Sequence, residues 1–189
     1  MEAIDALTTR VSPLRLGPQE VDEAAVRRIL DAGLRAPDHG RLRPWKFLLV
    51  RGEARARLGD VMAEALRLRD PGSADASLEA ERGKPMRAPL IVIVAAAVRA
   101  GTKIPVIEQV ESAAAAAQNM IVAAHALGLG ALWRTGAAAY DAHIKAALGL
   151  RADDCIVALL YIGEVATPGM AKVSDPTGVV EVWDGPLHK

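Results

Sequence analysis

The sequence predicts an α+β fold in which several helices surround a modest sheet. Apolar residues recur at helical spacing in several segments, whereas two short runs are apolar at nearly every position and suit strands buried on both faces. No internal repeat and no linker divides the 189 residues, and domains commonly hold about 100–200 residues. We therefore expect a single domain over residues 1–189.

Two helices are expected near the N-terminus. The first covers residues 2–9 and ends near Pro13, because a proline disfavours helical geometry at the residue before it. A second helix over residues 19–34 is predicted by one apolar face at helical spacing, and it ends before Pro37. Residues 38–40, Asp-His-Gly, then form a turn.

The middle of the chain alternates strand and helix. Residues 45–50 are expected to form a strand, and residues 53–68 a helix that is charged on its outer face. Residues 70–73 form a loop, and a short polar helix follows to about Arg82. The continuous apolar run over residues 90–97 predicts a strand that is buried on both faces.

A long helix is predicted over residues 105–127, and most of it lies in the most apolar stretch of the chain, roughly residues 112–132. Apolar residues and alanines occupy nearly all of its faces, so it has to be buried on nearly all sides, and a second subunit can cover one of them. Polar residues interrupt the run at Gln118, Asn119 and His125, whereas a membrane helix needs about 20 apolar residues with few such breaks. We interpret it as a buried helix in which His125 is structural.

The last third contains shorter elements. Residues 128–130, Gly-Leu-Gly, stop the long helix. They do not form a dinucleotide fingerprint, which needs a strand before the glycines and a helix after them, the reverse of the order here. A strand over residues 131–134, a helix over 140–148 and a buried strand over 156–162 follow. From about Thr167 the chain is rich in proline, glycine and charge, and we expect an extended tail.

Composition excludes several function classes. The 23 basic and 23 acidic side chains give a formal net charge of +0, without the basic field that nucleic-acid binding usually needs. Cys155 is the only cysteine, so no intrachain disulfide can form, and the first residues are acidic where a signal peptide is basic. The four histidines lack ligand spacing. We expect a cytoplasmic protein without a metal site and without nucleic-acid or membrane partners.

Polar side chains in loops are the candidates for chemistry. Arg10 and Ser12 follow the first helix, and a guanidinium with a hydroxyl can hold a phosphate; the alternative is that Arg10 only stabilises the helix C-terminus. Pro37 stiffens the turn that carries Arg35 and His39, so their side chains can be held in place to bind a ligand. The alternative is that Arg35 is only a cation at a helix end and His39 only a solvated turn residue.

The third candidate is a loop at the end of a short strand, a place where ligand contacts are common. There Arg134 follows Trp133, and a buried arginine needs an anion; the alternative is an exposed strand end. No single group decides between a binding site and a structural role.

Taken together, four motifs resemble the FMN-dependent nitroreductase superfamily, and among its members the small YdjA-type NAD(P)H nitroreductases. The motifs are Arg35-Ala36-Pro37-Asp38-His39, Pro44-Trp45, Arg87-Ala88-Pro89 and Trp133-Arg134-Thr135-Gly136. The resemblance extends from the N-terminus to about Gly163. It implies a central, mostly antiparallel sheet flanked by helices, and a homodimer with two FMN sites across its interface.

The resemblance also implies roles for individual residues. Arg10 and Ser12 match contacts to the phosphate and the flavin ring, whereas Val11 stands where arginine is frequent in the family and offers only its backbone. A basic residue of the tail often lies near the phosphate in the family; Lys172 is the only nearby candidate, and the role is not assigned to it. The remaining cofactor contacts that the resemblance implies are Arg35 and His39, from the partner subunit, and Trp133, Arg134 and Thr135, along the isoalloxazine.

The implied activity is electron transfer from NAD(P)H through FMN to a nitroaromatic, a quinone or a similar small acceptor. The cofactor supplies the chemistry and the protein supplies orientation and electrostatics. The sequence names no catalytic acid and does not choose between NADH and NADPH. Three alternatives remain open: a protein that stores or senses FMN without turnover, a flavin enzyme with another acceptor, such as a dehalogenase or an enone reductase, and, least favoured, an interaction module without a cofactor.

Overall fold

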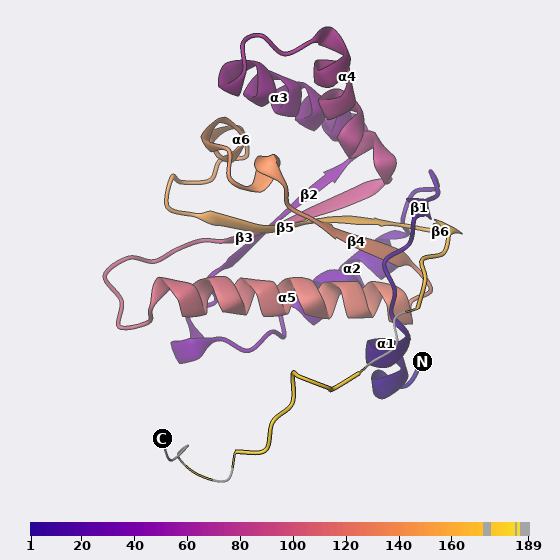
Figure 1. Cartoon of the computed structure of the whole chain (residues 1–189), viewed down its shortest axis with the longest axis vertical. Helices are drawn as coiled ribbons and strands as arrows, with labels where there is room; N and C mark the ends of the chain where they lie inside the picture. Colours follow the sequence, from indigo (N-terminus) through magenta and orange to yellow (C-terminus); the bar gives the residue numbers. More distant parts are fainter. Residues whose placement is uncertain (172–174, 184, 186–189) are drawn as a thin grey trace.

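The computed structural model describes residues 1–171, 175–183 and 185, so Lys172 lies outside the described residues. At its centre is a four-stranded antiparallel sheet with helices on both faces (Figure 1). This architecture confirms the predicted α+β class with an antiparallel sheet. In order across the sheet, the strands are β2 (Trp45–Arg51), β3 (Leu90–Ala96), β5 (Cys155–Gly163) and β4 (Gly130–Arg134).

The core lies on both sides of β3, whose seven residues are all buried. Successive side chains of a strand point to opposite faces, so Val92 and Val94 join one apolar cluster and Ile91 and Ile93 join another. Helices cover both faces, which is why the strand is apolar at every position. The prediction of a strand buried on both faces is confirmed.

Helices α1 (Ala3–Thr9), α2 (Glu23–Gly33) and α5 (Val106–Ala126) cover one face of the sheet (Figure 1). The second helix begins later than predicted because the Asp22 carboxylate caps it, accepting a hydrogen bond from the Ala25 amide at 3.2 Å. The long helix ends as predicted: Gly128 adopts a φ of +80° that suits glycine and turns the chain away.

The other face carries α3 (Ala54–Arg69), α4 (Asp75–Gly83) and α6 (Ala142–Ala147). The predicted helix over residues 140–148 begins two residues late, because Asp141 caps it by accepting from the Ile144 amide at 3.1 Å. Three short 3₁₀ segments complete the helical elements: η1 (His39–Arg41), η2 (Lys84–Arg87) and η3 (Ala137–Ala139).

A two-stranded ribbon, absent from the sequence prediction, ties the start of the chain to its last strand. β1 (Arg15–Leu16) pairs antiparallel with β6 (Val165–Thr167), and Leu14 and Gly17 extend the pairing with backbone bonds of 2.9 and 2.8 Å. A two-residue strand is too short to show a hydrophobic period, which explains why it was missed. Among the described residues, no helix combines the length and the apolar character needed to cross a bilayer.

Candidate functional site

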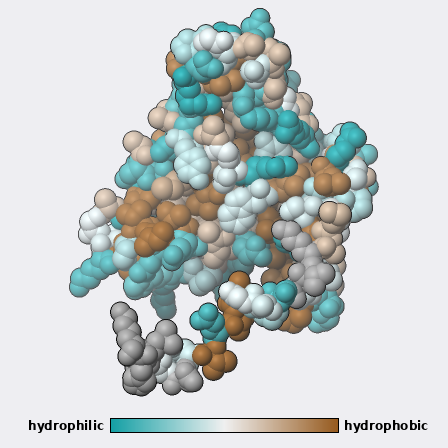
Figure 2. All heavy atoms as spheres, in the orientation of Figure 1, coloured by the Kyte–Doolittle hydropathy of each residue, from teal (hydrophilic) through white to brown (hydrophobic). Residues whose placement is uncertain are grey.

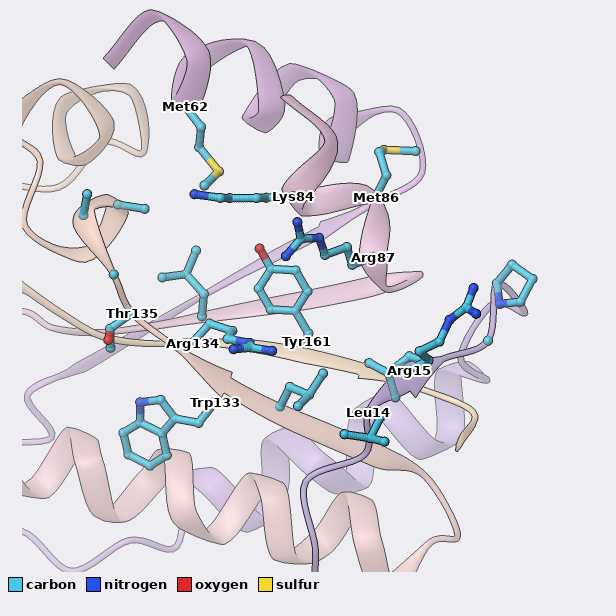
Figure 3. A pocket seen from close by; sticks show the side chains of 18 residues that line it. Leu14, Arg15, Met62, Lys84, Met86, Arg87, Trp133, Arg134, Thr135 and Tyr161 are labelled. Carbon is cyan, nitrogen blue, oxygen red and sulfur yellow. The ribbon is translucent and has the colours of Figure 1, made fainter. Parts of the chain in front are cut away.

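An open cavity of about 960 Å³ lies on the α3 side of the sheet, between β1, η2, β4 and β5 (Figure 3). Its base is formed by the sheet, where Leu132 of β4 lies opposite Tyr161 of β5. Met62 of α3 and Met86 of η2 contribute flexible apolar walls. The remaining lining residues are Leu14, Arg15, Leu16, Gly17, Pro18, Lys84, Arg87, Trp133, Arg134, Thr135, Gly136, Ala137, Ala138 and Leu159.

The cavity is positively charged. Arg15, Lys84, Arg87 and Arg134 line it, and none of the described lining residues is an aspartate or a glutamate. Lys84 pairs with Glu81 just outside the lining. Within the described part of the chain, the three arginines make no ion pair and no side-chain hydrogen bond. Unpaired guanidinium groups beside apolar walls favour an anionic or electron-rich ligand.

Tyr161 brings a polar hydroxyl to this cationic cavity. Tyr161 is only 5% exposed, and in Figure 3 its hydroxyl points toward the side of the cavity that Lys84 and Arg87 line. Burial raises the pKa of Tyr161, and the positive charges of Arg87 and Arg134 only partly oppose that effect. The hydroxyl is therefore protonated at neutral pH and can donate a hydrogen bond to a ligand.

The end of β4 places all three residues of its predicted loop at the cavity. Arg134 lines it with Leu132 from one face of the strand, whereas Trp133 points to the α5 side and lies at the rim, since strand side chains alternate. The indole nitrogen of Trp133 donates to the Val157 carbonyl at 3.1 Å, which fixes the ring. Thr135 precedes Gly136, whose φ of +60° turns the chain along the cavity wall.

Arg10, Val11 and Ser12 lie near the C-terminal end of α5 and do not line the cavity. The preceding residue, Thr9, shares a 3.0 Å hydrogen bond with the Nε2 atom of His125, consistent with a structural role for this histidine. Arg10 is half-buried and has no ion-pair partner among the residues that the structure describes.

Arg35 and His39 lie near the opposite, N-terminal end of α5. The Nδ1 atom of His39 is 2.5 Å from the Glu108 carboxylate in the first turn of this helix. The buried Ser112 hydroxyl donates to the Pro37 carbonyl at 2.9 Å. These contacts hold the loop on α5, while the Arg35 side chain remains exposed.

Of the three predicted groups of site residues, only the group at the end of β4 lines the cavity. The other two groups lie at opposite ends of α5. Glu108 and His125 mark the two ends of α5, and because a helix rises about 1.5 Å per residue, they lie roughly 25 Å apart. One FMN molecule cannot contact both Arg10 and His39 of the same chain if these residues keep their positions at the two ends.

Sequence reasoning missed four lining residues with charged or hydroxyl groups. Arg87 belonged to a recognised motif but received no role, and Arg15, Lys84 and Tyr161 were not singled out. The sequence contains no local signal for them, because the pairing of β4 with β5 brings Tyr161 beside a loop that lies far away along the chain. The described residues contain no group of three or more potential metal ligands.

Comparison with known proteins gives a consistent result. The sequence profile of the Nitroreductase family matches residues 7–164. The chain is 37% identical over 182 residues to the Escherichia coli K12 protein YdjA, whose name places it provisionally among the NAD(P)H nitroreductases; the match covers 95% of this chain and 98% of that protein. A similarly named Haemophilus influenzae protein is 31% identical, with 97% of each chain covered.

Solved structures share the fold. A nitroreductase-like protein from Bacillus cereus aligns with a TM-score of 0.82 at 22% identity, covering 98% of this chain and 97% of that one. A provisionally named nitroreductase from Desulfovibrio desulfuricans, solved in complex with FMN, aligns with a TM-score of 0.74 at 27% identity, covering 98% and 99%. The antiparallel sheet, the cavity at the end of β4 and the family match lead to one assignment: this chain belongs to the nitroreductase family.

Proposed function

We propose that the protein is an FMN-dependent oxidoreductase that passes electrons from NAD(P)H to a small acceptor such as a nitroaromatic compound or a quinone. The observation that carries the proposal is the cationic cavity at the end of β4, in a chain whose family relatives include an FMN complex. The names of the sequence relatives, which include NAD(P)H nitroreductase, support NAD(P)H as the donor.

The cavity fits FMN in size and chemistry. Cofactor pockets commonly measure about 300–1,000 Å³ and combine apolar walls with a few convergent polar groups. Here Leu132 and Met62 offer apolar surface to a ring system, and Arg134 and Lys84 offer donors. When bound, FMN accepts a hydride from a nicotinamide and returns two electrons to an acceptor.

The chain's own residues would orient the reactants and stabilise negative charge. Preorganised cations and hydroxyls lower the energy of charge that develops on a reduced ring, and Arg134 and Thr135 are placed to do so. Met62 and Met86 present apolar surface to one side of the cavity. No side chain is assigned as a proton donor to the acceptor.

We further propose a homodimer in which each FMN site uses both ends of α5. A two-fold axis that sets two α5 helices antiparallel would bring Arg10 and Ser12 of one chain toward Arg35 and His39 of its partner. The outer surface of α5 supports this arrangement: Ile107 is 61% exposed, and apolar side chains gather over the N-terminal end of the helix (Figure 2). In this arrangement Arg10 and Ser12 contact the phosphate.

The absence of any possible intrachain disulfide supports a cytoplasmic location, which we include in the proposal.

The first experiment is an absorbance spectrum of the purified protein, followed by anaerobic addition of NADPH or NADH. We expect oxidised flavin bands that a nicotinamide bleaches. Flavin that neither nicotinamide reduces would favour storage or sensing, and failure to bind added FMN would overturn the proposal.

A further inference from the structure

The cavity contains more positive charge than one neutral ring system requires. We propose that its preferred acceptors are anionic aromatic compounds, whose carboxylate or similar group binds to Arg87 and Tyr161. The inference rests on the proposed function, because it names the acceptor class of the same site.

Arg87 and Tyr161 form a pair of neighbouring donors from separate elements. Arg87 leaves the end of η2, and Tyr161 rises from β5 toward it (Figure 3). A guanidinium presents two parallel N–H groups that match the two oxygens of a carboxylate, and a protonated phenol adds a third donor. Within the described part of the chain, neither side chain makes a hydrogen bond or an ion pair with another protein group, so both are available to a ligand.

Lys84, another cation that lines the cavity, contrasts with Arg87. Its ammonium group pairs with the Glu81 carboxylate, so its charge is largely compensated. Arg87 has no such partner among the described residues, and the same is true of the lining cations Arg15 and Arg134. The uncompensated charge of the cavity therefore lies on its three arginines, and of these Arg87 and Arg134 act electrostatically on Tyr161.

The cavity also has room for a second ring. At about 960 Å³ it lies near the upper end of the usual range of about 300–1,000 Å³ for small-molecule sites. Met62 and Met86 are flexible and polarizable, so they can pack against aromatic rings of different shape. An acceptor ring can therefore lie between these methionines and the cofactor.

The test separates two competing uses of the charge. The FMN phosphate is proposed to bind Arg10 and Ser12, which lie outside the cavity lining. The phosphates of NAD(P)H are also anionic, and their binding to Arg87 would change the KM for NAD(P)H instead of the preference between acceptors. An anionic acceptor gains from the same charges. For a nitro acceptor, two electrons and two protons convert the nitro group to a nitroso group and release water, while the carboxylate does not react.

The test compares 4-nitrobenzoate with the uncharged 4-nitrobenzamide as acceptors for the holoenzyme. In ping-pong kinetics, kcat/KM for the acceptor reports the oxidative half-reaction alone. The ratio of the two kcat/KM values is measured for the wild type, for Arg87→Gln and for Tyr161→Phe. Comparing the ratio between proteins cancels the difference in reduction potential between the two compounds.

We expect Arg87→Gln to lower the benzoate-to-benzamide ratio roughly tenfold or more, and Tyr161→Phe to lower it by a smaller factor. Arg57→Gln is the control, because Arg57 lies exposed on α3 outside the cavity lining and pairs only with Glu53. This control should leave the ratio unchanged. Calorimetric titration with unreactive benzoate and benzamide gives a second readout, in which Arg87→Gln should weaken benzoate binding alone.

Equal losses for both acceptors in Arg87→Gln would overturn the inference, because they would indicate a damaged cavity or a displaced cofactor. A rise in KM for NAD(P)H without a change in the acceptor ratio would also overturn it and would assign Arg87 to the nicotinamide phosphates. If the wild type reduces both acceptors without preferring the anion and does not bind benzoate, the inference fails while the proposed function stands. If NAD(P)H reduces the bound flavin but neither compound reoxidises it, the inference fails while the proposed function stands; if neither nicotinamide reduces the flavin, the proposed function itself fails.

Discussion

Asp154 shows how a single residue in this chain stabilises a charge in the interior. It is 4% exposed and accepts hydrogen bonds from the Val98 amide at 3.0 Å, the Arg151 amide at 2.9 Å and the Arg151 guanidinium at 2.9 Å. Burial alone would raise the pKa of this carboxyl, but these hydrogen bonds outweigh burial and hold the pKa below its ordinary value of 3.8. The carboxylate therefore stabilises the fold above its unfolded pKa, and this contribution is lost as the pH falls through the folded pKa.

We expect Asp154→Asn to lower the free energy of unfolding by about 1–3 kcal/mol near neutral pH, because an amide cannot accept all these bonds. The deficit should shrink as the pH falls below the unfolded pKa, because protonation of this carboxyl then favours the unfolded wild type. Urea unfolding near pH 7 and near pH 3 measures both values. Asp153→Asn at the exposed neighbour should change stability by less than about 0.5 kcal/mol. An equal deficit at the two pH values would contradict the role of the charge.

Arg10 leads to a second prediction at this scale. Its half-buried guanidinium has no described partner, so it can bind the cofactor phosphate. We expect Arg10→Gln to raise the Kd for FMN by roughly tenfold or more, since hydrogen bonds to charged groups are among the stronger ones. Quenching of FMN fluorescence on binding to apoprotein gives the Kd. Arg57→Gln should leave it unchanged, and an unchanged Kd in Arg10→Gln would remove Arg10 from the site.

At the scale of elements, the crossing of α3 and α4 depends on one glycine. A methyl group on Gly59 of α3 would collide with the carbonyl oxygen of Arg82 in α4, and backbone cannot move aside as a flexible side chain can. We expect Gly59→Ala to destabilise the protein by about 1–3 kcal/mol. Gly83→Ala is the matched control, because nothing lies within 4 Å of its added methyl. Thermal unfolding compares the two, and equal Tm values would show that the helices can move apart freely.

The elements also show what the sequence could predict. β3 was predictable because burial on both faces requires an apolar residue at every position, and α5 because its glycine stop and its apolar surface are both local patterns. The starts of α2 and α6 were placed too early, because their caps at Asp22 and Asp141 depend on side-chain bonds rather than on the hydrophobic pattern. β1 and β6 stabilise each other across the fold, and neither carries a signal of its own.

At the scale of the whole molecule, the proposed dimer completes the cofactor site. We expect Ile107→Asp on the exposed side of α5 to give a folded monomer that retains little FMN, because a buried charge without a partner opposes association. Leu68→Asp on α3 is the control, since that leucine is 62% exposed on the other side of the sheet. Light scattering after gel filtration gives the mass, and absorbance gives the flavin content. A dimeric Ile107→Asp protein with full flavin would place the interface elsewhere.

The molecular scale explains why only part of the site was accessible from sequence. Motifs identified the three cationic loops, but their spatial relation depends on the length of α5 and on a second subunit. The Arg87–Tyr161 pair required the register between β3, which follows Arg87, and β5, and these two residues are 74 positions apart in the chain. Local patterns thus identify site residues, whereas their combination is a property of the assembled fold.

The length of α5 sets the distance between the two proposed cofactor sites of the dimer. If each site uses the N-terminal end of α5 from one subunit and the C-terminal end from the other, the distance from His39 to Arg10 within a subunit affects both sites equally. Removing one turn would shorten that span by about 5.4 Å and misalign both centres at once. Loops elsewhere can gain or lose residues without such a consequence. The helix is therefore the segment in which insertions and deletions should be tolerated least, although its sequence consists largely of alanines.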